Sequence, residues 1–178
     1  AGGADNNFAT VTLEGRFGDD TFSITPIAGI DINAAGNDPT ASDRAVVNGT
    51  TAADTIDYTP TADDGGVLQV NALGVVTLST IESLSINGLG GDDTLEVNTA
   101  DGANTIVYTP GSTIDSGAVQ VDSLLSASFE NLGASGILSL RNDAAGMNDR
   151  EDTLVYRGSG VADAFGAAAA GNVTLSNS

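Results

Sequence analysis

The hexapeptide TIDYTP at residues 55–60 returns as TIVYTP at residues 105–110, 50 residues further along the chain. Two further blocks recur in the same order at a nearly constant offset: 66–70 (GVLQV) as 117–121 (GAVQV), and 81–84 (IESL) as 129–132 (FENL). Because three blocks keep their order, the sequence predicts an internal repeat of about 48–50 residues.

Partial copies extend this repeat towards both ends of the chain. TFSITP at residues 21–26 is a degenerate early copy, and TLVY at residues 153–156 opens a third one. We therefore expect residues 1–178 to form one repeat-built β domain, taken from a longer or processed chain. The expected repeats are residues 1–47 (degenerate), 48–98, 99–147 and 148–178 (partial and capping).

Short segments rich in Val, Ile, Leu and Thr alternate apolar with polar residues and predict β-strands with one buried face. The expected strands are 67–70, 75–80, 83–86, 94–97, 105–108, 118–121, 137–140 and 153–156. Clusters of Gly, Asn and Asp between them are typical of turns. The alanine run at residues 167–170 favours a short helix within 161–170, with a flexible or capping tail as the alternative.

Repeated short strands are compatible with two all-β architectures. One is a parallel β-solenoid (β-helix) with about two windings per repeat, and the other is a set of antiparallel β-sandwich modules. The constant offset and an aromatic content of 4% favour the solenoid, whose narrow interior suits Val, Ile, Leu and Ala. Tyr58, Tyr108 and Tyr156 share one repeat position and would align on one face, as an internal stack or as a surface ladder.

The composition excludes several functions. The net charge is −19, the five basic residues are all Arg, and the chain contains no Lys, His, Cys or Trp. Soft-metal centres and His-dependent catalytic triads are therefore excluded. Nucleic acid is a poor partner without basic residues, and no apolar run is long enough for membrane insertion. Pairs of acids are too common to mark a catalytic site, so we do not expect an enzyme.

An acidic turn recurs before several of the expected strands. It reads GLGGDDTL at residues 88–95, GRFGDDTF at 15–22 and GTTAADTI at 49–56, with weaker versions at 102–106 and 150–154. Hard cations such as calcium prefer oxygen ligands, which these turns supply. The candidate calcium ligands are Asp19, Asp20, Asp54, Asp92, Asp93, Asn104 and Asp152.

These turns resemble the Gly-rich nonapeptide of RTX (repeats-in-toxin) calcium-binding proteins. The resemblance implies that Asp20, Asp54 and Asp93 each add a carboxylate to a calcium ion held between successive turns of a parallel β-roll. The family's sites need tandem turns, and Asp93 and Asn104, 11 residues apart, come closest to that spacing. The unit around the turns also resembles repeats of large secreted or surface proteins of bacteria.

Two interpretations without a specific metal site stay open. An Asp or Asn before a strand commonly accepts hydrogen bonds from nearby backbone amides. A chain rich in Asp and without Lys is also typical of salt-adapted proteins, in which salt relieves the repulsion between carboxylates.

Together these patterns predict a structural protein that is extracellular or at the cell surface. It would serve as a stalk, filament, surface-layer or matrix component, with calcium as a stabilising ion and exposed strand edges that favour self-association into a homopolymer. Other surface proteins are possible partners. The alternative is an adhesive module that binds glycan or protein, for which the aligned tyrosines would supply the binding surface.

Overall fold

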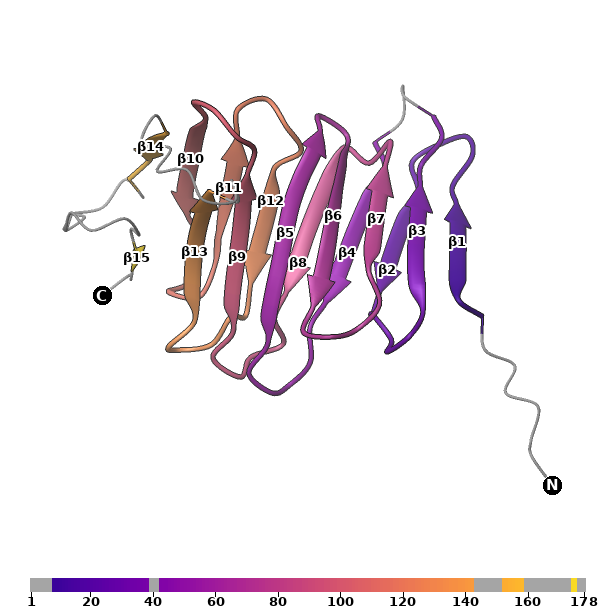
Figure 1. The fold of residues 1–178 in the computed structure, drawn as a ribbon, viewed down its shortest axis with the longest axis horizontal. Coiled ribbons are helices and arrows are strands. Elements are labelled where there is room, and N and C mark those ends of the chain that lie inside the picture. The colour runs from indigo at the N-terminus through magenta and orange to yellow at the C-terminus, as the bar shows by residue number, and fades with distance from the viewer. Residues whose placement is uncertain (1–7, 39–41, 143–151, 159–173, 176–178) are drawn as a thin grey trace.

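The computed structural model describes residues 8–38, 42–142, 152–158 and 174–175. This part of the chain is all-β, as the sequence predicts, and forms two mixed sheets that lie face to face without closing into a barrel (Figure 1). The helix or tail expected at 161–170 lies outside the described residues, as does most of the expected capping segment 148–178.

The larger sheet has eight strands and faces the viewer in Figure 1. Its spatial order is β1 (Thr10–Glu14), β3 (Asp31–Ala35), β7 (Val76–Ser79), β6 (Gly65–Val70), β5 (Thr55–Ala62), β9 (Thr94–Thr99), β13 (Ile137–Asn142) and β15 (Thr174–Leu175).

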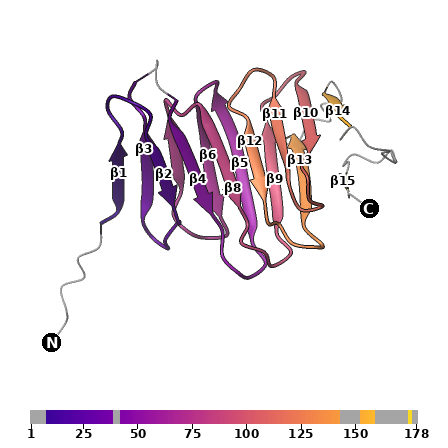
Figure 2. The ribbon, with the colours of Figure 1, turned by 180° about the vertical axis from the view of Figure 1, so that it is seen from behind.

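The smaller sheet has seven strands and faces the viewer in Figure 2. Its spatial order is β14 (Thr153–Tyr156), β10 (Thr105–Pro110), β11 (Gly117–Val121), β12 (Ala127–Glu130), β8 (Ser83–Asn87), β4 (Arg44–Asn48) and β2 (Thr21–Ile24).

The chain passes from one sheet to the other and returns to pair in parallel with an earlier strand. β1 pairs with β3, and β2 pairs with β4, each in parallel. Two antiparallel meanders interrupt this alternation, β5–β6–β7 in the eight-stranded sheet and β10–β11–β12 in the seven-stranded sheet. Each meander therefore adds three strands to one sheet before the chain crosses again.

The core lies between the two sheets and is built mainly by alternating residues of the strands from β2 to β13. The burial of β5 follows this period, with Ile56 and Tyr58 at 0% and 1% exposure. The inward residues are mainly Val, Ile, Leu and Ala, with few aromatic rings. Burial of the apolar face is what fixes the register of these strands, since a shift by one residue would turn that face outwards.

The two meanders match in detail although they belong to different sheets. Thr55 N–H donates to Asn71 Oδ1 at 2.9 Å, and Thr105 N–H donates to Asp122 Oδ1 at 2.8 Å. Asn71 and Asp122 both have φ 51, a left-handed conformation that Asn and Asp tolerate better than other side chains. Successive copies of the hexapeptide thus build the same meander on opposite sheets.

This exchange of sheets separates the tyrosines that share a repeat position. Tyr58 belongs to the eight-stranded sheet, and its hydroxyl donates to Leu125 O at 2.6 Å. Tyr108 belongs to the seven-stranded sheet, where its ring stacks on Phe129 and meets Tyr156 edge-on at 5.3 Å. Tyr58 and Tyr108 are buried, so the expectation that all three align on one face was wrong for Tyr58.

Candidate functional site

The acidic turns lie at both ends of the strands and lead into strands of both sheets. Five of the candidate ligands stand directly before a strand: Asp20 before β2, Asp54 before β5, Asp93 before β9, Asn104 before β10 and Asp152 before β14. The turns before β5 and β9 lie at the lower edge of Figure 1, and those before β2 and β10 lie at the upper edge.

Asp54 and Asp93 are joined by two hydrogen bonds between neighbouring turns. Asp54 N–H donates to Asp93 Oδ1 at 2.9 Å, and Thr94 N–H donates to Asp54 O at 2.8 Å. The aspartate side chain of the later turn thus accepts a hydrogen bond from the backbone N–H of the earlier turn. The residue that follows this aspartate donates its own N–H to the backbone carbonyl of the earlier turn. We call this two-bond arrangement an aspartate clasp.

An aspartate side chain forms the same clasp in two other places among the described turns. Asp20 N–H donates to Asp43 Oδ1 at 2.7 Å, and Arg44 N–H donates to Asp20 O at 2.8 Å. Asn104 N–H donates to Asp152 Oδ1 at 2.9 Å, and Thr153 N–H donates to Asn104 O at 2.8 Å. The clasped pairs are therefore 20/43, 54/93 and 104/152.

Asp43 is a member of this set that sequence reasoning missed. It is fully buried, and its own amide donates to Glu82 Oε2 at 2.7 Å. The hydrogen bonds from Asp20 to Asp43 and from Asp43 to Glu82 thus join successive turns in a row, and we use this word for turns linked in this way. Its turn lacks the Asp-Thr pair, because Arg44 follows it, and its glycine, Gly36, lies seven residues earlier instead of five. An acid directly before an alternating strand was the signal that could have found it.

The structure does not bring Asp93 and Asn104 together, although they come closest to tandem spacing. β9 belongs to the eight-stranded sheet and β10 to the seven-stranded sheet, so the two turns lie at opposite ends of the strands (Figure 1). The true neighbours are 23, 39 and 48 residues apart. The tandem interpretation of 93 and 104 was therefore wrong.

Asp19 and Asp92 make equivalent bonds one residue before the clasps. Asp19 Oδ1 accepts Ser42 N–H at 3.0 Å, and Asp92 Oδ1 accepts Ser135 N–H at 2.9 Å. Both side chains are exposed. All seven candidate ligands thus take part in hydrogen bonds with neighbouring turns, through the backbone or the side chain. Asp54 and Asn104 also form side-chain hydrogen bonds within their own turns.

The second carboxylate oxygen of several clasps is buried against a glycine. Oδ2 of Asp20, Asp43 and Asp93 is buried and has no hydrogen-bond partner. A Cβ placed on Gly88 would lie 2.2 Å from Asp93 Oδ2 and 2.6 Å from the carbonyl oxygen of Asn131. Only a glycine leaves room there for the carboxylate and the carbonyl of the next turn.

Asp54 and Asn104 satisfy the corresponding atom in different ways. Asp54 Oδ2 accepts Thr50 N–H at 2.6 Å. Asn104 Nδ2 donates to Ala100 O at 2.8 Å and to Gly102 O at 2.7 Å. The asparagine shows that an amide can replace the carboxylate in this turn and gain hydrogen bonds to carbonyls.

Burial raises the pKa of the Asp93 carboxyl, although the Asp54 amide opposes this shift. The charges of Asp54 and Asp92 raise the pKa further. Burying a carboxylate without a counter-ion costs folding free energy. Protonation of Asp93, or a cation bound beside it, would therefore lower that cost.

The described residues supply calcium ligands only in part. No group of three His, Cys, Asp or Glu side chains within them is close enough to hold a metal ion. Asp43 and Asp93 each offer a carboxylate whose Oδ1 already accepts an amide and whose Oδ2 lies on the same glycine as a backbone carbonyl. Asp152 Oδ2 instead accepts a hydrogen bond from the Thr99 hydroxyl. Calcium takes six to eight oxygens, so an ion there would depend mainly on backbone carbonyls.

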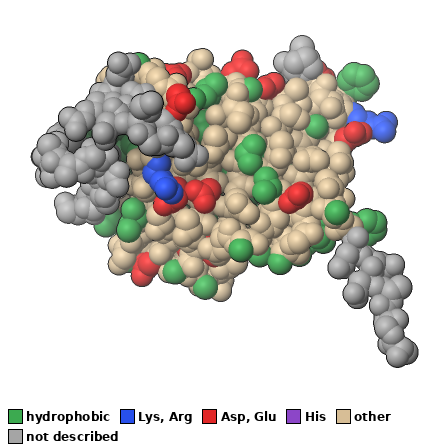
Figure 3. All heavy atoms as spheres, viewed as in Figure 1, with side chains coloured by type: hydrophobic (Ala, Val, Ile, Leu, Met, Phe, Trp, Pro, Cys, Tyr) green, Lys and Arg blue, Asp and Glu red, His purple; other side chains and the backbone are tan. Residues whose placement is uncertain are grey.

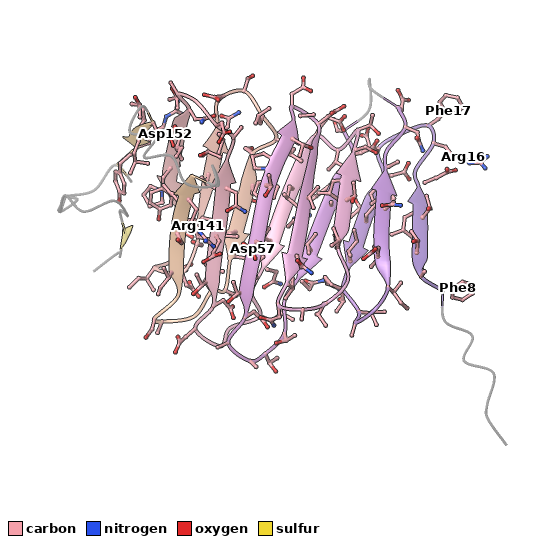
Figure 4. All side chains as sticks on the ribbon, in the orientation of Figure 1. Phe8, Arg16, Phe17, Asp57, Arg141 and Asp152 are labelled. Atoms are coloured by element: carbon pink, nitrogen blue, oxygen red, sulfur yellow. The ribbon has the colours of Figure 1, made fainter. Side chains whose placement is uncertain are left out.

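A second polar cluster lies on the outer face of the eight-stranded sheet, where Asp57 and Arg141 are labelled in Figure 4. Asp57 pairs in register with Glu96, and Glu96 forms a salt bridge with Arg141. Burial raises the pKa of Asp57, as does the neighbouring Glu96, while Arg141 lowers it. The space-filling view shows a few charged groups on this face, separated by backbone and by side chains of other types (Figure 3).

A scan of protein-family models and searches of curated proteins and of solved structures found no match to this chain. Within the described residues, no helix has both the length and the apolar character needed to cross a membrane. The candidate site therefore has to be interpreted from its own geometry.

Proposed function

We propose that this protein is a self-associating structural component of a cell surface or extracellular matrix. One observation supports this role above the others: the recurring acidic residues are engaged in clasps that join one turn to the next. A motif repeated for binding or catalysis would leave its polar groups available to a ligand. Here the repeated motif serves the stacking of the chain itself.

We further propose that the architecture is a two-sided β-solenoid interrupted by two meanders. Parallel pairing between strands separated by a crossing to the other sheet supports the solenoid over a sandwich. A solenoid grows in one direction by adding turns, which suits a stalk or filament. Its strand edges remain open at the ends and favour association.

Light scattering and electron microscopy over a concentration series test the structural role. We expect elongated particles whose mass rises with protein concentration and with salt, because salt screens the repulsion between chains of net charge −19. A chain that stays monomeric under all these conditions, and that instead binds a glycan array, would favour the adhesive module.

We propose calcium as a stabiliser of the formed scaffold rather than a requirement for folding. Three buried Oδ2 atoms without hydrogen-bond partners support this, as does the excess of negative charge. The fold can form without the ion, because the Oδ1 atoms hold the turns through backbone amides.

Thermal unfolding in excess EDTA, followed by calcium titration at fixed ionic strength, tests this proposal. We expect a cooperative transition in EDTA and a rise in Tm with calcium that matched sodium does not reproduce, since a ligand that binds the native state stabilises it. An unchanged Tm would remove calcium from the account and leave the clasps as the sole role of the acidic turns.

A further inference from the structure

We propose that copies of this chain join head to tail through the seven-stranded sheet, with β14 of one copy pairing in parallel with β2 of the next. This inference rests on the proposed self-association and names its interface. Among the described strands, β2 and β14 are the two edges of that sheet. They run in the same direction, since β12 is parallel to β8, β4 and β2, and two antiparallel pairings followed by a parallel one lead from β12 to β14.

The clasps give the two edges complementary hydrogen-bonding groups. In every described clasp the earlier turn donates its amide to the side chain of the later turn. Asp20 lies in the first described turn of its row, so no described turn donates an amide to its carboxylate. Asp152 is the last of its row and accepts the amide of Asn104. In the joint, Asp152 N–H of one copy would donate to the Asp20 carboxylate of the next.

The backbone groups of the two edges also match. Along a strand, successive residues direct their backbone N–H and C=O groups to opposite neighbours. Asp20 O accepts Arg44 N–H of β4, so the backbone groups of Thr21 and Ser23 point to the other edge of β2. The bond from Thr153 N–H to Asn104 O likewise turns the backbone N–H and C=O of Leu154 towards the other edge of β14, with which no described strand pairs. With Thr153 opposite Thr21, each backbone N–H on one of these edges faces a backbone carbonyl oxygen on the other.

The same register continues the apolar interior across the joint. Leu154 would lie opposite Phe22, and Tyr156 opposite Ile24, all four on the inward face of their strands. Leu154 and Tyr156 are only partly buried in the single chain. Next to the β2 edge, the turn carries Phe17 at 93% exposure, and Figure 4 shows this side chain at the end of the molecule.

The eight-stranded sheet contributes less to this joint. At the far end its edge strand is β15, which pairs antiparallel with β13, so β13 has no open edge for β1 of the next copy. Both copies are strongly negative. We therefore expect the joint to strengthen with salt.

Cysteine pairing tests the register directly, because the chain contains no cysteine. Ser23 and Val155 are exposed on the outward face and would lie opposite one another in the joint. A mixture of the full-length variants Ser23→Cys and Val155→Cys, oxidised under assembling salt, should form a disulfide-linked dimer. The matched control mixes Ser23→Cys with Thr77→Cys, an exposed residue of β7. This mixture should form at least tenfold less of the disulfide-linked dimer.

A proline variant tests the joint without any cross-link. Ser23→Pro removes an amide that faces the open edge, a position at which an edge strand tolerates proline. It should keep the monomer's circular dichroism and Tm close to those of Ser23→Ala while losing the large particles that Ser23→Ala still forms.

The outcomes separate this joint from the function on which it rests. Assembly that persists in Ser23→Pro, without the 23–155 disulfide, would overturn the β14–β2 joint and leave the structural role intact. A wild-type chain that stays monomeric at every salt and calcium concentration would overturn both. The specific disulfide together with the loss of assembly in Ser23→Pro would establish the joint.

Discussion

Gly36→Ala is expected to destabilise the fold more than the same change at any other clasp glycine. Its new Cβ would lie 2.0 Å from Asp43 Oδ2 and 2.2 Å from Thr80 O, inside the contact distance of both atoms. Asp43 is fully buried and clasped to Asp20, so neither group can move without breaking the row. We expect a loss of about 3 kcal/mol, at the upper end for overpacking, measured by denaturant unfolding.

The other clasp glycines form a graded series that serves as an internal control. The shortest contact of the added Cβ lengthens from Gly36 (2.0 Å) through Gly88 (2.2 Å) and Gly15 (2.6 Å) to Gly49 (2.8 Å). The losses should follow this order. Gly65→Ala, whose nearest contact is 3.1 Å, should cost less than all four. Equal losses across the series would show that loss of glycine flexibility, rather than contact with the clasp, is responsible.

Replacing Asp93 with Asn and with Ala is expected to change stability in opposite directions. Asp93→Ala removes the acceptor of the Asp54 amide and should cost about 1–3 kcal/mol. Asp93→Asn keeps Oδ1 as acceptor and places an amide nitrogen where the unpartnered Oδ2 lies, beside the Asn131 carbonyl. In EDTA at neutral pH, we expect the Asn variant to be more stable than the wild type.

The pH dependence of stability provides a separate readout of the same residue. The pKa of Asp93 is raised in the folded state, so its contribution to stability is fully present below the unfolded pKa of about 3.9. That contribution is lost as the pH rises through the raised folded value. The wild-type Tm should therefore increase as the pH is lowered through the raised folded pKa of Asp93. Asp57, whose pKa is also raised, contributes in the same direction.

Asp93→Asn should reduce this increase in Tm, whereas Asp63→Asn, which removes one charge from an exposed loop, should leave it nearly unchanged. Acidification also lowers the overall negative charge, and the comparison of the two variants separates that effect from the buried group. A pH profile shifted equally by both variants would contradict a special role of Asp93.

Much of the secondary structure was predictable because strands bury one face. Leu95 and Val97 alternate with polar residues, and the strand expected at 94–97 is the start of β9. The acidic turns were also recognisable as the residues before strands. These features depend on a few consecutive residues, so the local sequence determines them.

The neighbours of each turn could not be predicted from spacing. Asp54 is clasped to Asp93 because the meander β5–β6–β7 and strand β8 come between them in the chain. The number of inserted strands varies along the molecule, so the distance between clasped residues varies as well. The exchange of sheets between Tyr58 and Tyr108 has the same origin, since the chain crosses between the sheets three times from β7 to β10, whereas it crosses twice from β12 to β14, which leaves Tyr108 and Tyr156 on the same sheet.

Amide hydrogen exchange of the clasped turns, followed by NMR in excess EDTA, tests the central claim most directly. The amides of Asp20, Asp54 and Asn104 lie in turns, yet each donates to a side chain of the next turn. We predict that they exchange as slowly as the amide of Leu95 in the core. Exchange as fast as that of exposed Ala53 would contradict the claim that the aspartates hold the turns together.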